Sequence, residues 1–262
     1  MQNNHRETIN KINYTSWNSP KTVLSYSSKE LLQKSEIVIL KEVKEKIRGK
    51  KILDIGVGTG RTVPYLLEIS SDYVGIDYSQ AMIDKCREKY PNFNFKCMDA
   101  RNLSIFNNQE FDFIFFSHNG LDCVPHEDRL IILREVKRVL KPGGYFCFSS
   151  HNRGFYKLGK YEFSWPPISF NPIKFLKALF RYCRAIYNHL KNKKYEINEQ
   201  EYSIINDDGV NYSLLIYYIT IEEQIKQLVR VGFKSTVVAY DQDGEKTRID
   251  SKSAWIYYLV TL

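Results

Sequence analysis

The stretch KILDIGVGTGR at residues 51–61 sets an apolar run directly before three glycines at alternate positions. Gly56, Gly58 and Gly60 contribute no side-chain packing, and each gives the unfolded chain backbone freedom that folding must remove. Glycines at this spacing indicate that another group comes close to the main chain here. We interpret the apolar run as a short buried strand, followed by a binding loop and a helix at residues 60–69.

The alternation of short apolar strands with amphipathic helices continues along the chain. It predicts further strands at residues 72–77, 92–97, 111–117 and 145–150, and helices at residues 30–47, 79–89 and 126–140. We expect KPGG at residues 141–144 to form a turn. The alternation resumes near residue 213, with a helix at 221–232 and strands at 233–240 and 253–262 that we expect to pair antiparallel.

These elements predict an α/β fold. We expect a doubly wound, mostly parallel, seven-stranded sheet with an antiparallel last strand and a helical cap insertion. Residues 1–34, which are polar with interspersed aromatics, would form a lid segment. Residues 35–152 and 213–262 would form the core, and residues 153–212 would be a substrate-binding cap over the mouth of the active site.

The positive charge of the chain is concentrated in the insertion. Residues 153–200 contain ten lysines and arginines against three glutamates, within a chain whose net charge is +8. Within them, residues 171–194 predict a helix with an apolar stripe and cations on the opposite face. Such a helix fits a cap with a solvated face, attraction of an anionic substrate, or contact with a membrane surface or RNA.

The cysteines and the first residues indicate the compartment. The five cysteines are scattered without a CxxC pair, which favours reduced thiols and argues against zinc. The opening MQNNHRETIN has no apolar region of the signal-peptide kind, and no run of about 18 apolar residues occurs. We therefore expect a cytoplasmic protein with no transmembrane segment and no bound metal.

Two familiar glycine-loop patterns do not fit residues 54–62. A nicotinamide-binding GxGxxG loop needs a third glycine where the chain has Arg61 or Val63. A phosphate-binding GxxxxGK[ST] loop needs a lysine after its last glycine, and here Arg61 and Thr62 follow Gly60. The remaining pattern is an aspartate, Asp54, followed by glycines at alternate positions.

This pattern resembles the nucleotide loop of the class I S-adenosylmethionine-dependent methyltransferases. The resemblance covers residues 35–150 and the last two strands, and it is carried in order by DIGVGTG, VGID, MDAR, FDFIFFSHNG and REVKRVLKPGGYFCFSS. It implies a Rossmann-like fold with S-adenosyl-L-methionine as the cofactor and S-adenosyl-L-homocysteine as its product. Glycines would let the main chain approach the cofactor, and the first helix would present free N–H groups beside it.

The resemblance implies a set of cofactor-binding residues. These are Asp54, Gly56, Gly58, Gly60, Arg61, Thr62, Asp77, Tyr78, Met82, Asp99, Ala100, Arg101, Ser117 and His118. Asp54 would steady the loop or meet the ammonium group, and Asp77 would accept both ribose hydroxyls. Asp99 would receive the adenine amino group. The alternative is that Asp77 has a structural role only, at the start of the helix that Ser79 caps.

Two strands end in the same triplet, SHN, at residues 117–119 and 150–152. Ligands of such sheets lie beyond the carboxyl ends of the strands, so His118 and His151 are candidate catalytic bases. The alternative is that no base is needed: a sulfonium is already activated, so orientation and desolvation would supply much of the rate, and the histidines would line the pocket or support the fold. The candidate substrate-binding residues are Asn119, Asp122, Asn152, Tyr14 and Trp17.

The absence of several motifs narrows the acceptor. The fourth strand lacks [DNS]PP[YF] and a Pro-Cys pair, which mark enzymes that methylate nucleic-acid bases. We therefore expect methyl transfer to an oxygen or nitrogen of a small molecule, with an anionic acceptor as one option. The alternatives are an RNA-modifying methyltransferase, supported by the basic insertion, and a non-catalytic protein that binds the cofactor.

Overall fold

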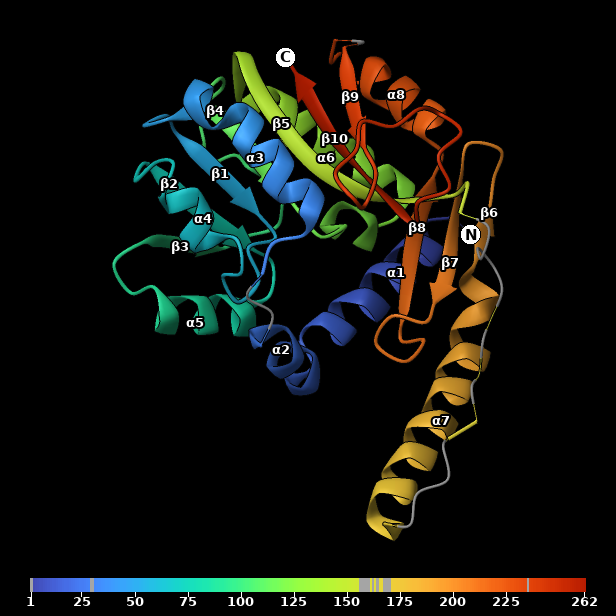
Figure 1. Cartoon of the computed structure of the whole chain (residues 1–262). Coiled ribbons are helices and arrows are strands. Elements are labelled where there is room, and N and C mark those ends of the chain that lie inside the picture. The colour runs from blue at the N-terminus through green and yellow to red at the C-terminus, as the bar shows by residue number, and fades with distance from the viewer. Residues whose placement is uncertain are drawn as a thin grey trace.

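The computed structural model describes residues 2–28, 31–155, 161, 163, 165–166, 171–234 and 236–262. Within these residues, ten strands join one sheet (Figure 1). The strands are β1 Ile52–Ile55, β2 Tyr73–Asp77, β3 Asn94–Cys97, β4 Phe111–Phe116, β5 Leu140–Asn152, β6 Ile197–Asn198, β7 Tyr202–Asp207, β8 Leu214–Ile219, β9 Val237–Tyr240 and β10 Trp255–Thr261.

Seven of these strands form the doubly wound core that the sequence predicts. Their order is β3-β2-β1-β4-β5-β10-β9, and the first five are parallel. The last strand, β10, runs antiparallel to both β5 and β9. The predicted fold class is thus confirmed, including the antiparallel last strand.

The sheet has more strands than the seven predicted. At the carboxyl end of β5, His151 pairs with Tyr218 and Asn152 with Ile219, so β8 joins in parallel. Strands β7 and β6 follow in antiparallel order. Strands β6 and β7 belong to the insertion at residues 153–212, which is therefore strand as well as helix.

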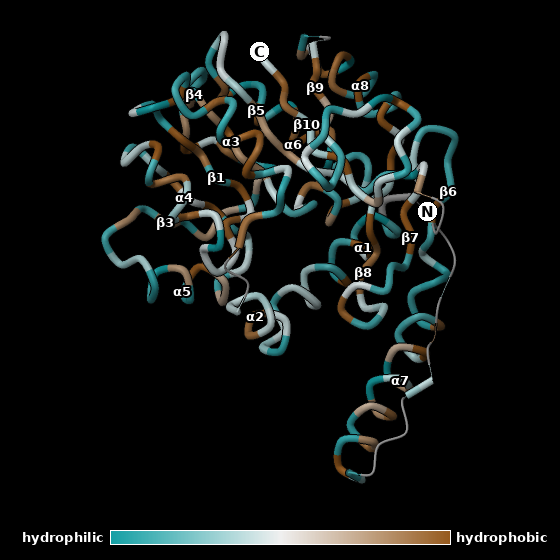
Figure 2. Tube along the Cα trace, in the orientation of Figure 1, coloured by the Kyte–Doolittle hydropathy of each residue, from teal (hydrophilic) through white to brown (hydrophobic). Residues whose placement is uncertain are grey.

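Helices cover both faces of the core. They are α1 Gln2–Trp17, α2 Pro20–Ser27, α3 Lys34–Ile47, α4 Val63–Leu67, α5 Gln80–Lys89, α6 His126–Val139, α7 Pro172–Asn192 and α8 Ile221–Arg230, with short 3-10 turns η1 Gly120–Cys123 and η2 Lys193–Tyr195. Along β1, Leu53 packs on the side of α6 and α8, whereas Ile52 packs on the side of α3, α4 and α5. Figure 2 shows apolar residues along the strands, as burial from both faces requires.

The predicted turn at residues 141–144 is wrong. These residues lie within β5, where Phe111 pairs with Leu140 but Phe113 pairs with Tyr145. The four residues between bulge from the ladder, and Gly143, whose φ is +77°, donates its N–H to the Leu262 carbonyl at 2.9 Å. A partner from the far end of the chain keeps this stretch in the sheet.

The predicted amino-terminal lid segment forms two helices, α1 and α2. Ile9 of α1 is buried against Leu215 and Tyr217 of β8. The Asn13 amide donates to the Leu215 carbonyl at 2.7 Å and accepts from its N–H at 2.9 Å. Because this amide satisfies both main-chain groups, α1 docks against β8 much as a strand edge would.

A fully buried ion pair lies beneath the carboxyl end of β5. The Arg129 guanidinium donates to Asp122 Oδ1 at 2.6 Å, and neither side chain has exposed surface. Ser150 donates its hydroxyl to the same oxygen, and Gln224 accepts from Arg129. Hydrogen bonds on every side compensate for removing both charges from water.

We predict that Asp122→Ala destabilises the fold by about 3–5 kcal/mol, because it leaves the buried Arg129 charge without a negatively charged partner. Urea denaturation measures the change. The control is Glu88→Ala, which removes an exposed pair with Lys85 and should cost less than about 1 kcal/mol. Equal losses in the two variants would contradict a stabilising role for the buried pair.

Candidate active site

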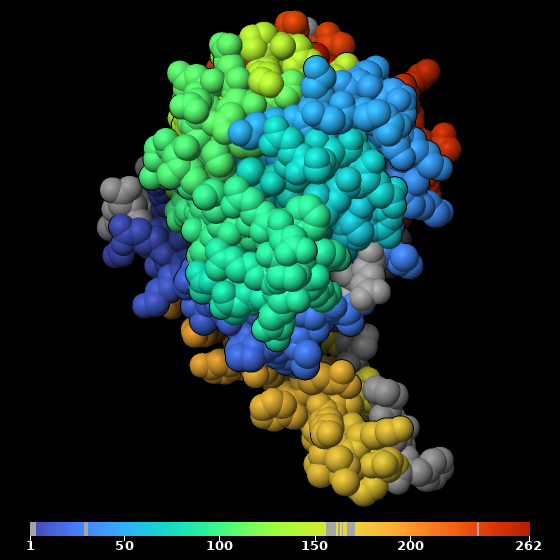
Figure 3. Space-filling view, turned by 90° about the vertical axis from the view of Figure 1, so that its left-hand side faces the viewer, coloured from blue at the N-terminus to red at the C-terminus, as the bar shows by residue number. Residues whose placement is uncertain are grey.

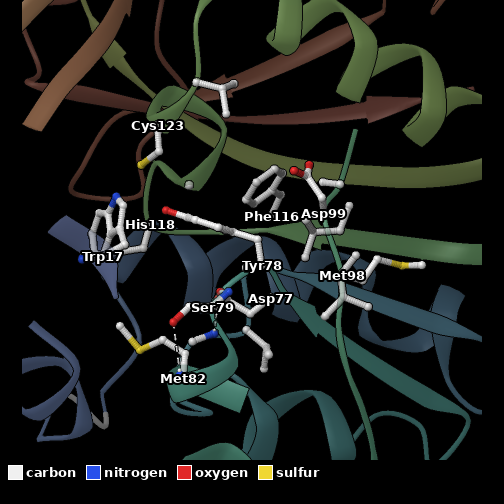
Figure 4. Close-up of a pocket in the computed structure, with 18 of the residues that line it drawn as sticks. Trp17, Asp77, Tyr78, Ser79, Met82, Met98, Asp99, Phe116, His118 and Cys123 are labelled. Carbon is white, nitrogen blue, oxygen red and sulfur yellow. Dashed lines mark hydrogen bonds between the residues drawn. The ribbon is translucent and has the colours of Figure 1, made fainter. Parts of the chain in front are cut away.

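A cavity of about 530 Å³ lies at the carboxyl ends of β1 to β4. The sheet order reverses direction at β1, which lies between β2 and β4, so this is the switch point where such sheets bind ligands. Figure 4 shows its lining side chains. The predicted residues in its wall are Gly56, Gly58, Arg61, Thr62, Asp77, Tyr78, Met82, Asp99, Ala100, Arg101, Ser117, His118, Tyr14 and Trp17.

The glycines of the loop have different reasons to be glycine. Gly58 has a φ of +56°, and apart from the Gly56 carbonyl oxygen at 4.0 Å nothing lies near the place where a Cβ would stand. Its bare main chain therefore faces the cavity. Gly60 lies outside the cavity wall, and a Cβ there would meet the Tyr90 ring at 2.6 Å. Close packing on α5, rather than ligand contact, requires Gly60.

Asp54 supports the loop from below. Its carboxylate is buried and accepts from the Thr62 hydroxyl at 2.5 Å and from Tyr73 at 2.9 Å. Asp54 does not line the cavity. Of its two predicted roles, this position agrees with steadying the loop rather than with meeting the ammonium group. Burial raises the pKa of Asp54 to about 7, although the bonds from Thr62 and Tyr73 oppose the rise.

Asp77 ends β2 and faces the cavity beside Gly58. Its Oδ2 accepts from the Gly58 N–H at 3.0 Å, and its Oδ1 accepts from the Ser79 N–H at 2.8 Å. Burial raises its pKa to about 6 against these two bonds. Each carboxylate oxygen keeps further acceptor capacity, so starting the helix and binding a ligand are compatible roles.

Arg101 joins the end of β3 to the lid. Its Nε lies 3.0 Å from both Asp99 carboxylate oxygens, and its Nη1 donates to Asp128 at 3.0 Å. Asp128, buried at the start of α6, also accepts from Arg6 and Asn10 of α1. One carboxylate thus holds together the lid and the strand end.

Arg61 and Ser117 form a second internal tie. Arg61 donates to the buried Glu36 carboxylate at 2.6 and 2.8 Å and to the Ser117 hydroxyl at 2.7 Å. Burial alone would raise the pKa of Glu36, but the Arg61 guanidinium outweighs it and holds that pKa below its ordinary value. Both predicted residues line the cavity while fixing α3 to the end of β4.

His118 lines the cavity in a left-handed backbone conformation, with a φ of +53°. Its Nδ1 lies 3.0 Å from Gln33 Nε2, and the amide oxygen of Gln33 accepts from the Tyr257 hydroxyl at 3.0 Å. With the amide in this orientation its nitrogen donates to Nδ1, and a neutral ring then carries its proton on Nε2. In this tautomer His118 presents a donor rather than a base through Nε2.

Besides Asp54 and Gly60, four residues predicted as catalytic or substrate-binding do not line the cavity. His151 shares its Nδ1 with Asp122 at 2.7 Å, and its Nε2 lies 3.2 Å from the Asn119 amide. Asn152 donates to the carbonyls of Ser251 and Ser253. These contacts join β5 to its neighbours, and the roles predicted for His151, Asn119, Asp122 and Asn152 stay predictions.

The cavity also has walls that the sequence did not indicate. Asn10, Lys11 and Asn13 of α1 and Cys123 of η1 line it, and Tyr26 of α2 stands 5.8 Å from the His118 ring. The aromatic spacing of the amino-terminal segment was the available signal. Residues of α1 and α2 line the cavity whereas no described residue of the insertion does, and the cap role of residues 153–212 stays a prediction.

Among the residues that the structure describes, no group of three histidine, cysteine or acidic side chains is placed to hold a metal ion. None of the helices in the same residues combines the length and apolarity needed to cross a bilayer.

The matched part of the chain resembles known methyltransferases. Residues 52–144 match the family model described as a methyltransferase domain. A phthiotriol/phenolphthiotriol dimycocerosates methyltransferase of Mycobacterium tuberculosis is 36% identical over 105 residues, 38% of this chain and 37% of that protein. A ubiquinone biosynthesis O-methyltransferase of Coxiella burnetii is 32% identical over 124 residues, 45% of this chain and 51% of that protein.

The match to these curated relatives thus spans no more than about half of their length. A solved S-adenosylmethionine-dependent methyltransferase from Clostridium acetobutylicum has a TM-score of 0.58 and 18% identity, over 87% of this chain and 91% of that one. Residues 52–144 therefore resemble a methyltransferase domain, and the fold is the Rossmann-like fold of the class I enzymes, as the sequence predicts. S-adenosylmethionine is the cofactor of this class.

We predict that stability falls as the pH rises from about 4 to about 7. The folded carboxyls of Asp54 and Asp77, with pKa values of about 7 and about 6, bind protons more tightly than the unfolded chain does. Asp54→Asn should make this fall shallower in urea denaturation. Asp72→Asn, on the exposed amino side of β2, should leave the slope unchanged. An unchanged slope in Asp54→Asn would contradict the assignment.

Proposed function

We propose that the chain transfers the methyl group of S-adenosyl-L-methionine to an oxygen or nitrogen of a small-molecule acceptor. The observation that carries the proposal is the pairing of bare main chain at Gly58 with the Asp77 carboxylate in the wall of one cavity. The methyltransferase match at residues 52–144 supports it.

The residues present fit the cofactor. The open space at Gly58 accommodates a group packed against the main chain, and Asp77 retains acceptor capacity for two ribose hydroxyls. Tyr78 and Met82 provide apolar surface for the base, with Asp99 at its edge. A volume of about 530 Å³ suits a bound small molecule. When bound, the cofactor supplies an activated methyl group on a sulfonium.

The acceptor would lie at the aromatic end of the cavity. The rings of Trp17 and Tyr26 are 5.1 Å apart, and Tyr26 meets the His118 ring at 5.8 Å (Figure 4 places Trp17 near His118). These rings would exclude water and orient the acceptor, while the Nε2–H of His118 donates to it. Lys11 in the same wall would favour an acceptor with negative charge.

The RNA alternative rests on the basic insertion. No described residue of 153–212 lines the cavity, so the described part of that charge does not support RNA as the acceptor. A wall built from α1 and α2 favours a small acceptor instead.

We predict that Asp77→Asn weakens S-adenosylhomocysteine binding at least about tenfold, because a charge-assisted contact becomes neutral. Wild-type affinity should fall as the pH drops through about 6, where the Asp77 carboxylate takes up a proton. The variant should lose this dependence. Calorimetric titration measures both, with Asp72→Asn, directly before the same strand, as the matched control. Wild-type affinity in the Asp77 variant would refute the ribose role.

We predict that His118→Ala slows transfer about tenfold and leaves cofactor affinity unchanged, because one hydrogen bond to the acceptor is lost. Labelled S-adenosylmethionine with a metabolite extract provides the assay. His118→Gln should recover part of the rate, since its amide also donates. A glutamine variant as slow as alanine, with a wild-type rate that rises through the pKa of an imidazole, would indicate a base instead.

A further inference from the structure

Helix α7 extends away from the rest of the chain (Figures 1 and 3). Its carboxyl end is held to the hairpin of β7 and β8. His189 Nδ1 lies 2.9 Å from Asn206 Oδ1, and Asn192 donates to the Tyr212 carbonyl at 3.1 Å. His189 and Asn192 are the residues buried in this helix, so the preceding turns project into solvent.

An apolar stripe runs along the projecting helix. Its members recur at intervals of three and four residues, which places them on one face. The stripe consists of Ile173, Leu176, Phe180, Tyr187 and Leu190, with exposed fractions of 63%, 61%, 66%, 64% and 71%. Cys183, also exposed, completes the spacing between Phe180 and Tyr187. Side chains this apolar and this exposed indicate a surface that something covers.

Cations border the stripe. The helix PIKFLKALFRYCRAIYNHLKN contains five lysines and arginines and no acidic residue. Lys177, Arg184 and Lys191 each follow a stripe position and form a row along one border. The partner of this face must therefore combine an apolar layer with negative charge.

We propose that α7 lies on a membrane surface that contains anionic lipid. The stripe enters the boundary between headgroups and acyl chains, and the bordering cations contact the headgroups. A second copy of α7 matches less well, because it would bring cations against cations. RNA would meet the charges but leave the aliphatic stripe in water.

The position of α7 fits this arrangement. Figure 1 shows α7 projecting on the same side of the molecule as α1 and α2, the helices that cover the cavity. Because the turns of α7 before His189 project from the molecule, membrane attachment through them does not require a change in the core. The stripe residues do not line the cavity, so the membrane proposal is tested separately from the proposed function.

Vesicle flotation of the full chain tests the proposal. We expect binding to phosphatidylcholine vesicles that contain phosphatidylglycerol, weaker binding at high salt, and little binding to phosphatidylcholine alone. The double variant Lys177→Gln with Arg184→Gln should reduce binding about 30-fold, at about tenfold for each 1.4 kcal/mol and about 1 kcal/mol for each cation.

The stripe has its own variant and a matched control. Leu176→Ser with Phe180→Ser should abolish binding to the anionic vesicles. Ile105→Ser with Ile249→Ser removes apolar side chains that are 56% and 63% exposed elsewhere, and should bind as wild type does. Unchanged S-adenosylhomocysteine affinity in the stripe variant shows that its core is intact.

Several outcomes would overturn the proposal. These are absence of binding to anionic vesicles, unchanged binding by the stripe variant, and equal loss in the control pair. Light scattering that shows a dimer dissociated by the stripe variant would assign the surface to a second copy. Salt-sensitive RNA binding that depends on Lys177 and Arg184, without vesicle binding, would assign it to nucleic acid.

Discussion

A hydrogen bond from the main chain of Gly58 to the carboxylate of Asp77 fixes the geometry of the cavity. It joins the loop after β1 to the end of β2, so two strand ends present one continuous polar surface. Gly58 donates this bond from a backbone conformation with positive φ, which favours glycine at this position of the loop. Asp54 holds the other side of the loop through Thr62. The loop is therefore set in place before any ligand arrives.

Ion pairs define the walls around this surface. Glu36, Arg61 and Ser117 tie α3 to β4 on one side, and Asp99, Arg101 and Asp128 tie β3 to α6 on the other. Asp128 also holds α1, so the lid is part of the same construction. Buried or partly buried charge is costly unless its partners are in position. This cost favours a single arrangement of the wall, and reacting groups are well oriented only in such a wall.

Local patterns predicted the core because each strand and helix there is specified by its own residues. The turn at KPGG failed because Leu262, far along the chain, supplies the hydrogen-bond partner. The strand-end argument selected both His118, which lines the cavity, and His151, which does not. It could not separate them, because it identifies an edge of the sheet and not the neighbours of each side chain. Asn10 and Lys11 reach the cavity because Asn13 docks α1 on β8, a contact between distant segments. The added strands β6 and β7 lie where the alternation had stopped.

The place of β10 between β5 and β9 bears on how the polypeptide matures on the ribosome. Residues 255–261 emerge after every other strand, yet they fill an interior position. Before β10 is made, β5 lacks its pairing with β10 along Tyr145–His151, and β9 also lacks its pairing with β10. Both strands then expose unpaired N–H and C=O groups that other nascent chains can pair with. Closure of the sheet is therefore a late event of biosynthesis, and chaperones have most to protect in the interval before it.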